Sequence, residues 1–370
     1  MKTRYLTGQV RKDIAKKMVF VSGPRQVGKT TLARQVIPDP AAYLSWDISE
    51  HRERILRREW PAGGEIIFDE IHKYRSWRNY LKGLVDQPDR QWKLLVVGSA
   101  RLDAYRFGGD SLQGRYHFLR LHPFSAAELG MSRPQELLDL LHLGGFPEPF
   151  LSGSETEARR WSREYRSRII RDEVTSLETI VDLGNLELMA LRLPQLVGSH
   201  LSINALREDL QVSHKTVSRW LQALERLYVI YRLAPFGAPR IRAVKKEQKH
   251  YQYDWTLVPD MPRRFENLVA GHLLKWVHFE QDAAGRDLEL RYFRDVDGRE
   301  VDFVVTDGMK PVRLIEAKWG DEKIDRGLRY LKTRFPEAEA VQISAVGEKD
   351  YVSPEGIRVR PALPYLSELV

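Results

Sequence analysis

The sequence predicts an α/β protein: a parallel sheet forms the first third of the chain, and a second α/β domain forms the last third. Short apolar runs alternate with helical stretches over residues 1–120, which is typical of a parallel sheet with crossover helices. A glycine-rich motif joins the first apolar run to the first of these helices. Further strands are predicted at 288–293 and 300–306. The expected strands of the first sheet are 18–22, 42–46, 65–69, 93–98 and 116–119.

The glycine-rich motif reads GPRQVGKT over residues 23–30 and matches the phosphate-binding pattern G-x-x-x-x-G-K-[ST]. Its glycines let consecutive backbone N–H groups point at a polyphosphate. Its lysine reaches the β- and γ-phosphates, and its threonine offers a hydroxyl to Mg²⁺. The flanking strand and helix make an ordinary glycine-rich turn the weaker interpretation. We therefore predict a site for ATP and Mg²⁺. The expected nucleotide contacts are Gly23, Gln26, Val27, Gly28, Lys29, Thr30 and Thr31.

The apolar run at residues 65–70 ends in two acids, Asp69 and Glu70. We expect this strand to lie beside the phosphate loop. Asp69 would then hold Mg²⁺ directly or through water, and Glu70 would polarise the water that attacks the γ-phosphate. Two adjacent acids in a solvated turn are the alternative. Glu70 favours hydrolysis over transfer of the phosphoryl group to another metabolite.

Two more polar residues are candidates for the same catalytic site. Ser99 follows the fourth strand, where its hydroxyl can contact the γ-phosphate or the attacking water. A helix cap or turn is an equally good interpretation of Ser99. Arg115 precedes the fifth strand and can reach the nucleotide of a neighbouring subunit as a finger. A surface arginine is the alternative, and Arg101 and Arg106 compete for the finger role.

The amino-acid composition excludes some classes of protein and favours others. The 370 residues include no cysteine, which excludes disulfides and cysteine-based metal sites. The net charge of +8 favours a polyanionic partner. The N-terminal residues lack the apolar core of a signal peptide, and no apolar stretch approaches the ~20 residues of a membrane span. We therefore expect a cytoplasmic protein with no membrane association.

Basic residues recur in the middle of the chain. Residues 159–171 hold six arginines against one glutamate; a solvated helix is the commoner explanation, and contact with a phosphate backbone is the alternative. Residues 183–250 predict a winged helix-turn-helix whose second helix, 214–227, exposes polar side chains. A three-helix unit that contacts protein is the competing interpretation. We interpret 240–249, with five Lys or Arg against one Glu, as a basic loop or wing tip. The predicted DNA contacts are Lys215, Ser218, Arg219, Gln222, Lys245 and Lys246.

The last third of the chain carries acids with the spacing of metal ligands. Asp302 lies on one predicted strand, and Glu316 precedes Lys318 by two residues on another, so Glu316 and Lys318 share a strand face. Asp302 and Glu316, with Glu266 from a preceding helix, can bind a divalent metal, and Lys318 can position or activate a water. A retained fold whose acids form salt bridges is the equally weighted alternative.

Taken together, these motifs resemble the prokaryotic AAA-type ATPases with a C-terminal DUF4143 domain. The resemblance implies an AAA+ P-loop core at 1–122, a helical lid and basic linker helix at 123–182, a winged helix-turn-helix at 183–250, and a restriction-endonuclease-like domain of the PD-(D/E)xK type at 251–370. The fourth strand ends in Gly-Ser-Ala where the family pattern has Gly-Ser-Ser, which retains Ser99 and removes a second hydroxyl. The motifs are GPRQVGKTT (23–31), IFDEIHK (67–73), LQGR (112–115), HPFSAAEL (122–129), GGFP (144–147), FENLVA (265–270), EVDF (300–303) and IEAK (315–318).

These features lead us to expect an ATPase that binds duplex or branched DNA and couples hydrolysis to remodelling or translocation. Branch migration of a Holliday junction is one such task, and a homo-oligomeric ring such as a hexamer is the expected assembly. Two alternatives stay open at this point. One is an ATP-gated, metal-dependent DNA nuclease, and the other is a nucleotide-dependent switch that acts on a protein partner.

Overall fold

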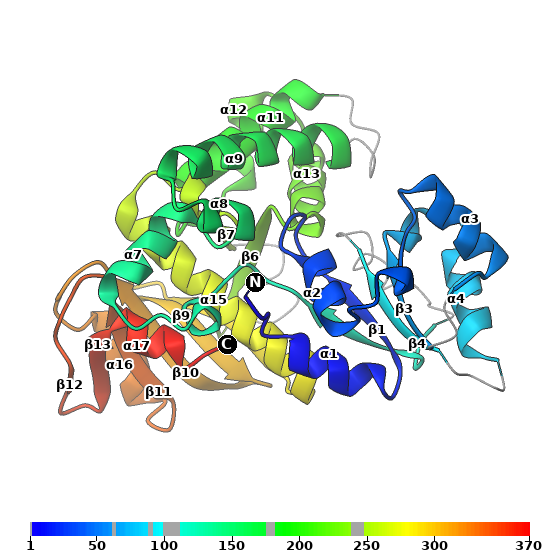
Figure 1. Ribbon diagram of the computed structural model, residues 1–370. Helices are drawn as coiled ribbons and strands as arrows, with labels where there is room; N and C mark the ends of the chain where they lie inside the picture. Colours follow the sequence, from blue (N-terminus) through cyan, green and yellow to red (C-terminus); the bar gives the residue numbers. More distant parts are fainter. Residues whose placement is uncertain (1, 61–63, 88–91, 99–111, 175–181, 238–247) are drawn as a thin grey trace. The chain divides into compact units, whose positions relative to one another are not determined.

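A computed structural model describes residues 2–60, 64–87, 92–98, 112–174, 182–237 and 248–370. The chain divides into two compact units. The first comprises Met1–Pro123 with Asp282–Ala284, and the second comprises Phe124–Gln281 with Gly285–Val370. Each unit is built around its own sheet (Figure 1).

The first unit holds a five-stranded sheet in the order β2-β3-β4-β1-β5, and all its strand pairs are parallel. Its strands are β1 (Met18–Ser22), β2 (Tyr43–Ser45), β3 (Glu65–Asp69), β4 (Lys93–Val97) and β5 (Tyr116–Arg120). Its helices are α1 (Thr7–Ile14), α2 (Lys29–Val36), α3 (Ser49–Arg57) and α4 (Trp77–Val85), with short 3-10 turns at Pro40–Ala42 and Ile71–Lys73. The predicted parallel α/β architecture of this region is confirmed.

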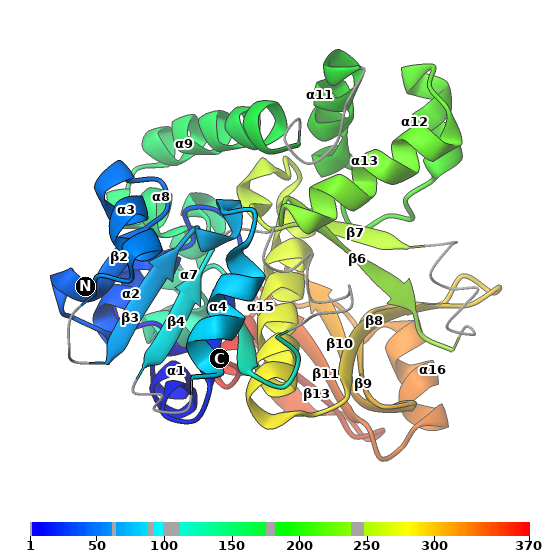
Figure 2. The ribbon, with the colours of Figure 1, turned by 90° about the vertical axis from the view of Figure 1, so that its right-hand side faces the viewer.

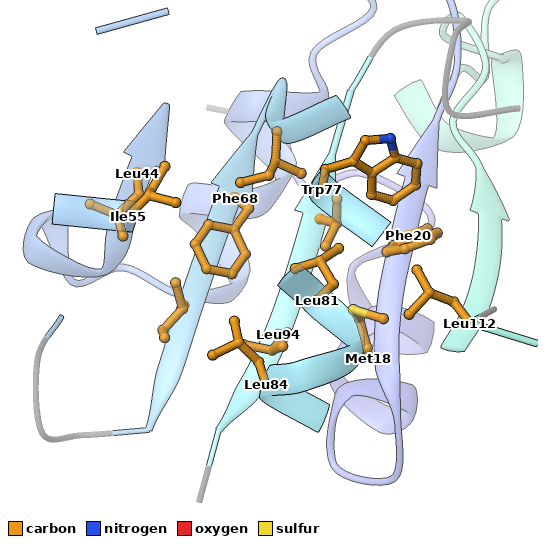
Figure 3. Packing of buried hydrophobic residues seen from close by; sticks show 13 residues of the cluster. Met18, Phe20, Leu44, Ile55, Phe68, Trp77, Leu81, Leu84, Leu94 and Leu112 are labelled. Carbon is orange, nitrogen blue, oxygen red and sulfur yellow. The ribbon is translucent and has the colours of Figure 1, made fainter. Parts of the chain in front are cut away.

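Helices cover both faces of this sheet, as the apolar sequence of its strands requires. Figure 3 shows one face, where Phe20 and Phe68 of the sheet pack with Leu81 of α4. The Phe20 ring also stacks on Tyr116 of β5, with 4.5 Å between ring centroids. Alternate residues of β1 face the opposite side, where α1 contacts β1 and α2 contacts β4. The buried sheet therefore fixes both ends of the loop that joins β1 to α2.

The second unit begins with helices and short turns. Phe146 packs against Trp161 and Tyr165 of α9, with ring centroids 4.8 and 5.0 Å apart, so the aromatic residues of this segment build its core. The helices are α6 (Ala126–Leu129), α7 (Pro134–Leu143), α8 (Pro147–Ser152), α9 (Glu155–Arg168), α11 (Leu183–Arg192), α12 (Ile203–Leu210) and α13 (His214–Arg226), with a π-helical turn at Ile169–Val174 and 3-10 turns at Leu193–Leu196 and Trp255–Leu257.

The rest of the second unit forms an eight-stranded mixed sheet in the order β12-β13-β11-β10-β9-β8-β6-β7 (Figure 2). Helix α16 packs on one face through Leu328 and Leu331, which contact Val301, Val304 and Leu314 in one apolar cluster. The strands are β6 (Ile230–Pro235), β7 (Lys249–Gln252), β8 (Leu288–Arg294), β9 (Glu300–Asp307), β10 (Lys310–Lys318), β11 (Glu339–Ser344), β12 (Tyr351–Val352) and β13 (Ile357–Pro361), and the helices are α15 (Met261–Ala284), α16 (Arg326–Arg334) and α17 (Ala362–Ser367).

The β6–β7 hairpin, which lies mostly within the range 183–250 expected for the winged helix-turn-helix, belongs to this sheet. Strand β6 pairs antiparallel with β7 and parallel with β8, where Ala234 lies opposite Arg291. The boundary expected at residue 250 therefore falls inside β7. Within the described parts of the chain, no helix is both long and apolar enough to cross a membrane.

Candidate functional site

Left-handed backbone shapes the loop between β1 and α2. Gly23, Gln26 and Gly28 have φ values of 149°, 57° and 97°. A Cβ atom at Gly23 would lie 2.2 Å from the carbonyl oxygen of Leu121, so only glycine fits there. Helix α2 begins at Lys29, directly after Gly28, which directs its first N–H groups toward the loop. This geometry suits an anion at the N-terminus of α2.

Two side chains of the loop take defined positions. The Lys29 ammonium is buried and donates to the carbonyl oxygens of Gly23 and Pro24, at 2.9 and 2.6 Å. The oxygens of a bound phosphate are charged and therefore stronger acceptors than these carbonyls. Thr30 donates its hydroxyl to Oδ2 of Asp69 at 2.8 Å. Thr30 and Asp69, 39 positions apart, are thus brought together as the sequence predicted.

Asp69 ends β3 and accepts two hydroxyl hydrogen bonds on one oxygen, from Thr30 and from Tyr43 at 2.7 Å. Burial raises the pKa of the Asp69 carboxyl, and these two hydrogen bonds oppose the rise. Burial and the bond to Asp69 raise the pKa of Tyr43 to about 12. A hydroxyl and a carboxylate that converge in this way are the oxygen donors that Mg²⁺ prefers, so the residues fit a nucleotide-bound Mg²⁺. Strand β4 separates β3 from β1, yet Asp69 still reaches the loop.

Glu70 follows Asp69 with φ 56°, a left-handed conformation that is uncommon for glutamate. Its N–H donates to the carbonyl of Val97 at 2.9 Å, which ties it to the end of β4. Its Oε2 lies 3.4 Å from Nε2 of His72 and 3.6 Å from Nζ of Lys73. Lys73 also binds Asp47 at 2.6 Å. The Glu70 carboxylate is therefore flanked by two basic groups of the IFDEIHK motif.

Arg4 is a site residue that the sequence analysis missed. Its buried guanidinium donates to the carbonyl oxygens of Val27, inside the phosphate loop, and of His122, at 2.6 Å in the latter case. Tyr43 was also missed; its ring stacks under the Arg34 guanidinium, 4.1 Å from the ring centroid. No local pattern marks Arg4 or Tyr43, because each acts on a segment far away in the sequence.

Arg115 and the phosphate loop lie at opposite ends of the parallel strands β5 and β1. Arg115 directly precedes β5, which runs parallel to β1, whereas the loop follows β1. The Arg115 guanidinium forms a two-pronged ion pair with Asp86, at 2.7 and 3.1 Å. Within one protomer Arg115 therefore does not serve the loop, and a finger role requires a second subunit. Ser99, Arg101 and Arg106 lie outside the described residues.

Four of the predicted DNA contacts lie on α13, and three of them are exposed. Lys215, Arg219 and Gln222 are exposed, and Ser218 is half-buried with its hydroxyl donating to the carbonyl of His214 at 2.8 Å. Lys245 and Lys246 lie outside the described residues. The opposite side of the helix is buried through Val217, Trp220, Leu221, Ala223 and Leu224.

In the second unit, the acids of the predicted metal site lie on neighbouring strands. Ile315 pairs with Phe303, so Glu316 on β10 stands beside Asp302 on β9. The Asp302 N–H donates to Oε2 of Glu316, and the Ala317 N–H donates to Oδ2 of Asp302, both at 3.1 Å. Each acid therefore accepts a hydrogen bond from the opposite strand.

Two lysines neutralise these acids. Nζ of Lys318 binds Oε1 of Glu316 at 2.7 Å. Nζ of Lys249, whose side chain is 1% exposed, contacts carboxylates of Glu300, of Glu266 at 3.5 Å and of Asp302 at 3.6 Å. We expected Lys249 on a basic loop or wing tip, and that placement is wrong: the residue begins β7 and is buried.

Burial dominates the electrostatics of this cluster. Burial, and then the nearby Glu266 charge, raise the pKa of Asp302 to about 7. Burial and Asp302 likewise raise the pKa of Glu316. Burial lowers the pKa of Lys249, but the surrounding carboxylates outweigh it, so the net shift is upward and the ammonium stays charged. Among the described residues, no three acidic or histidine side chains are placed to hold a metal ion. The expected metal set of Asp302, Glu316 and Glu266 is therefore not formed.

Comparison with known proteins divides the chain into three matched stretches. Residues 15–130 match the model of an AAA domain, 134–267 a domain of unknown function (DUF8612), and 263–362 a domain of unknown function (DUF4143). The phosphate loop, Asp69 and Glu70 thus lie in the AAA stretch, and the lysine-neutralised acids lie in the DUF4143 stretch or beside it.

Three individual proteins illustrate the similarity. The uncharacterized proteins Mb2031c of Mycobacterium bovis and Rv2008c of Mycobacterium tuberculosis are each 27% identical over 248 residues, which is 65% of this chain and 55% of the relative. The chain thus spans about half the length of these curated relatives. The solved Walker-type ATPase Paby2304 of Pyrococcus abyssi is 13% identical, with a TM-score of 0.45 over 70% of this chain and 97% of that one. The chain thus matches an AAA domain in its N-terminal part and DUF4143 in its C-terminal part, which confirms the expected resemblance to the prokaryotic AAA-type ATPases with a C-terminal DUF4143 domain.

Proposed function

We propose that the chain hydrolyses ATP with Mg²⁺ and uses the energy to remodel or translocate DNA as a homo-oligomer. The observation that carries the hydrolytic part is the 2.8 Å hydrogen bond between Thr30 and Asp69, with Glu70 as the next residue. The Thr30 hydroxyl and the Asp69 carboxylate thereby meet beside the predicted phosphate loop, and a second carboxylate, Glu70, follows directly in the sequence.

Each of these residues has a separate task. The N–H groups of the loop and the Lys29 ammonium bind and orient the β- and γ-phosphates. Thr30 and Asp69 would hold the metal ion, which would neutralise charge on the phosphate oxygens. Glu70 would orient the attacking water and accept its proton, as a carboxylate general base can do.

We infer that the basic groups beside Glu70 help to set the position of its carboxylate. Lys73 is shared between Glu70, at 3.6 Å, and Asp47, at 2.6 Å. The shorter contact belongs to Asp47, so the ammonium does not neutralise Glu70 alone. Glu70 can therefore turn toward a bound nucleotide while Lys73 keeps a carboxylate partner.

The DNA part of the proposal rests on charge and exposure. Lys215 and Arg219 lie on the exposed face of α13, and Arg163 and Arg168 are exposed on α9. Two other α9 arginines, Arg159 and Arg160, form ion pairs that are 55–70% exposed with Glu155 and Glu157. Exposed ion pairs of this kind contribute little to the free energy of folding, so the arginines can exchange them for contacts with DNA phosphates.

The test is an ATPase and binding screen with duplex, single-stranded and four-way-junction DNA at two salt concentrations. We expect DNA to stimulate the wild-type rate and Lys29→Ala to abolish hydrolysis. The double variant Lys215→Ala/Arg219→Ala should keep its basal rate, lose stimulation, and lower the slope of log affinity against log salt by about 2.

A matched double variant, Lys12→Ala/Lys16→Ala, removes the same charge from exposed positions in α1 and just after its end, and should leave DNA stimulation intact. DNA that neither stimulates hydrolysis nor binds in a salt-sensitive way would refute the DNA part and leave the ATPase part standing. A stable protein partner in the absence of DNA affinity would instead favour a nucleotide-dependent switch. No observation here favours cleavage of DNA.

A further inference from the structure

Strand β7 ends the eight-stranded sheet, and residues of α15 cover its outer edge. Asn267 accepts a hydrogen bond from the Gln252 N–H and donates one to the Gln252 carbonyl, both at 2.8 Å. An edge strand normally leaves such groups open to pairing with another chain. The asparagine of the FENLVA motif thus satisfies the backbone N–H and C=O of Gln252 at this edge, as a neighbouring strand would.

The preceding residue of the same motif, Glu266, binds the side chains of β7. Lys249 and Tyr251 lie on one face of the strand because side chains alternate. The Tyr251 hydroxyl donates to Oε1 of Glu266 at 2.7 Å, and the Lys249 ammonium lies 3.5 Å from the same oxygen. Both side chains are almost completely buried.

The Lys249 ammonium also reaches the acids of β9. It contacts Glu300 and lies 3.6 Å from Oδ1 of Asp302. One positive charge therefore stands among carboxylates from a helix and a strand, where the sequence led us to expect a divalent metal. The backbone of Lys249 is held opposite Leu233 of β6, and its ammonium lies 5.5 Å from the centre of the Tyr292 ring.

We propose that Lys249 is a built-in cation that takes the place of a divalent metal in this acidic cluster. The cluster then serves to clamp β7 onto α15 and β9, and it does not activate water for cleavage of a phosphodiester. Removing carboxylates from water is costly unless an opposite charge accompanies them, and Lys249 supplies that charge within the chain. A metal ion in the same place would bring a second positive centre within a few ångströms of the ammonium, where repulsion at low dielectric is strong.

The proposal is tested by titrating nucleotide-free protein with Mn²⁺ and following free Mn²⁺ by electron paramagnetic resonance. The amount of Mn²⁺ bound by wild type should be the same as that bound by Asp302→Asn and by Glu316→Gln. Lys249→Met should gain one Mn²⁺ site, and adding Asp302→Asn should remove it again. Lys249→Arg keeps the charge and should gain no site.

Lys275→Met is the matched control, because Lys275 is also a buried lysine of this unit, and its ammonium pairs with Glu128 at 2.6 Å, which is not an acid of the cluster. It should change stability without creating a Mn²⁺ site. Two results would overturn the proposal: wild-type binding of Mn²⁺ that depends on Asp302 or Glu316, or a folded Lys249→Met protein that gains no site. The wild-type measurement decides the matter even if Lys249→Met fails to fold.

Discussion

At the residue scale, one carboxylate organises the nucleotide site. Oδ2 of Asp69 receives hydroxyl hydrogen bonds from Thr30 and Tyr43, so this oxygen is held in place by two donors. The next residue, Glu70, is fixed through its backbone N–H to Val97, and its Oε2 lies 3.4 Å from Nε2 of His72 and 3.6 Å from Nζ of Lys73. The two neighbouring acids therefore differ in their surroundings: hydroxyl groups bind Asp69, and basic groups lie beside Glu70.

This difference predicts the behaviour of Glu70→Gln. The variant should bind ATP with near wild-type affinity, because Lys29 and Thr30 are untouched, and should hydrolyse it about 10²–10⁴ times more slowly. Fluorescent-nucleotide binding and steady-state ATPase rates measure the two properties separately. Glu65→Gln, at the start of the same strand and paired with Lys93, should keep the wild-type rate. Turnover of Glu70→Gln at the wild-type rate would show that another group is the base.

Sequence motifs predict the residues of this site that belong to a recognised local pattern, the phosphate loop and the two acids after β3. The phosphate loop lies within eight consecutive positions, and its strand and helix adjoin it. Arg4, in contrast, binds the Val27 carbonyl from 23 positions away, and Tyr43 reaches Asp69 across 26. Hydrogen bonds of this kind depend on how strands and helices pack, so no spacing in a single sequence reveals them.

At the element scale, the direction of β5 decides what Arg115 can do. Because β5 and β1 are parallel, Arg115 and the phosphate loop lie at opposite strand ends. The ion pair of Arg115 with Asp86 is about one-third exposed, and such pairs contribute little free energy. A neighbouring subunit could therefore replace Asp86 with its nucleotide at small cost.

A shared site predicts rescue between two inactive variants. Arg115→Ala and Lys29→Ala should each lose hydrolysis, and an equal mixture should recover about a quarter of the wild-type rate if subunits exchange at random and each site takes one finger from one neighbour. Lys29→Ala mixed with Glu70→Gln is the control, because both defects fall in the same subunit's own site and no rescue is expected. An Arg115→Ala protein that is fully active by itself would exclude the finger role.

Strand β7 shows why the sequence analysis misplaced an element. The five Lys and Arg residues of 240–249 suggested a basic loop or wing tip, whereas Lys249 begins β7, a strand that is buried at every position. The pairing of β6 with β8 joins residues 234 and 291. A domain boundary near residue 250 is a reasonable prediction from the sequence, because local patterns do not reveal strand pairing between residues so far apart in the chain.

At the scale of the whole molecule, buried histidines tie stability to pH. His272 donates from Nδ1 to the Leu268 carbonyl at 2.8 Å, and its Nε2 accepts from the Ala126 N–H at 3.0 Å. Burial lowers the pKa of His272 to about 4, with a smaller push from Lys275 against the opposing Leu268 contact. Protonation of Nε2 would remove the bond to Ala126, so the neutral ring is the stable form in the folded protein.

The unfolded pKa of histidine, near 6.5, exceeds the folded value, so the unfolded state binds more protons between these two pH values. The stabilisation from neutral His272 is complete above about pH 6.5 and is lost as pH falls through about 4, by about 3 kcal/mol in all. The raised pKa values of Asp302 and Glu316 instead favour the folded state as pH falls. The effect of His272 must therefore be measured as the difference in stability between wild type and a His272 variant.

We therefore expect wild type to lose stability relative to His272→Gln as pH falls from 7 to 4, with unfolding followed by urea denaturation. His214→Gln, at an exposed position of α13, should track wild type over the same range. Parallel stability curves for wild type and His272→Gln would mean that His272 is protonated equally in the folded and unfolded states.

The joining of β6 to β8 has a mechanical consequence. Helix α13 ends at Arg226, and β6 begins at Ile230, so only three residues separate the helix from a strand that is paired on both sides. Such a short connection ties the end of α13 closely to the start of β6. A pulling force on the exposed face of α13 would therefore pass into β6 and the strands paired with it. If hydrolysis moves α13 as proposed, we expect the sheet to move with it.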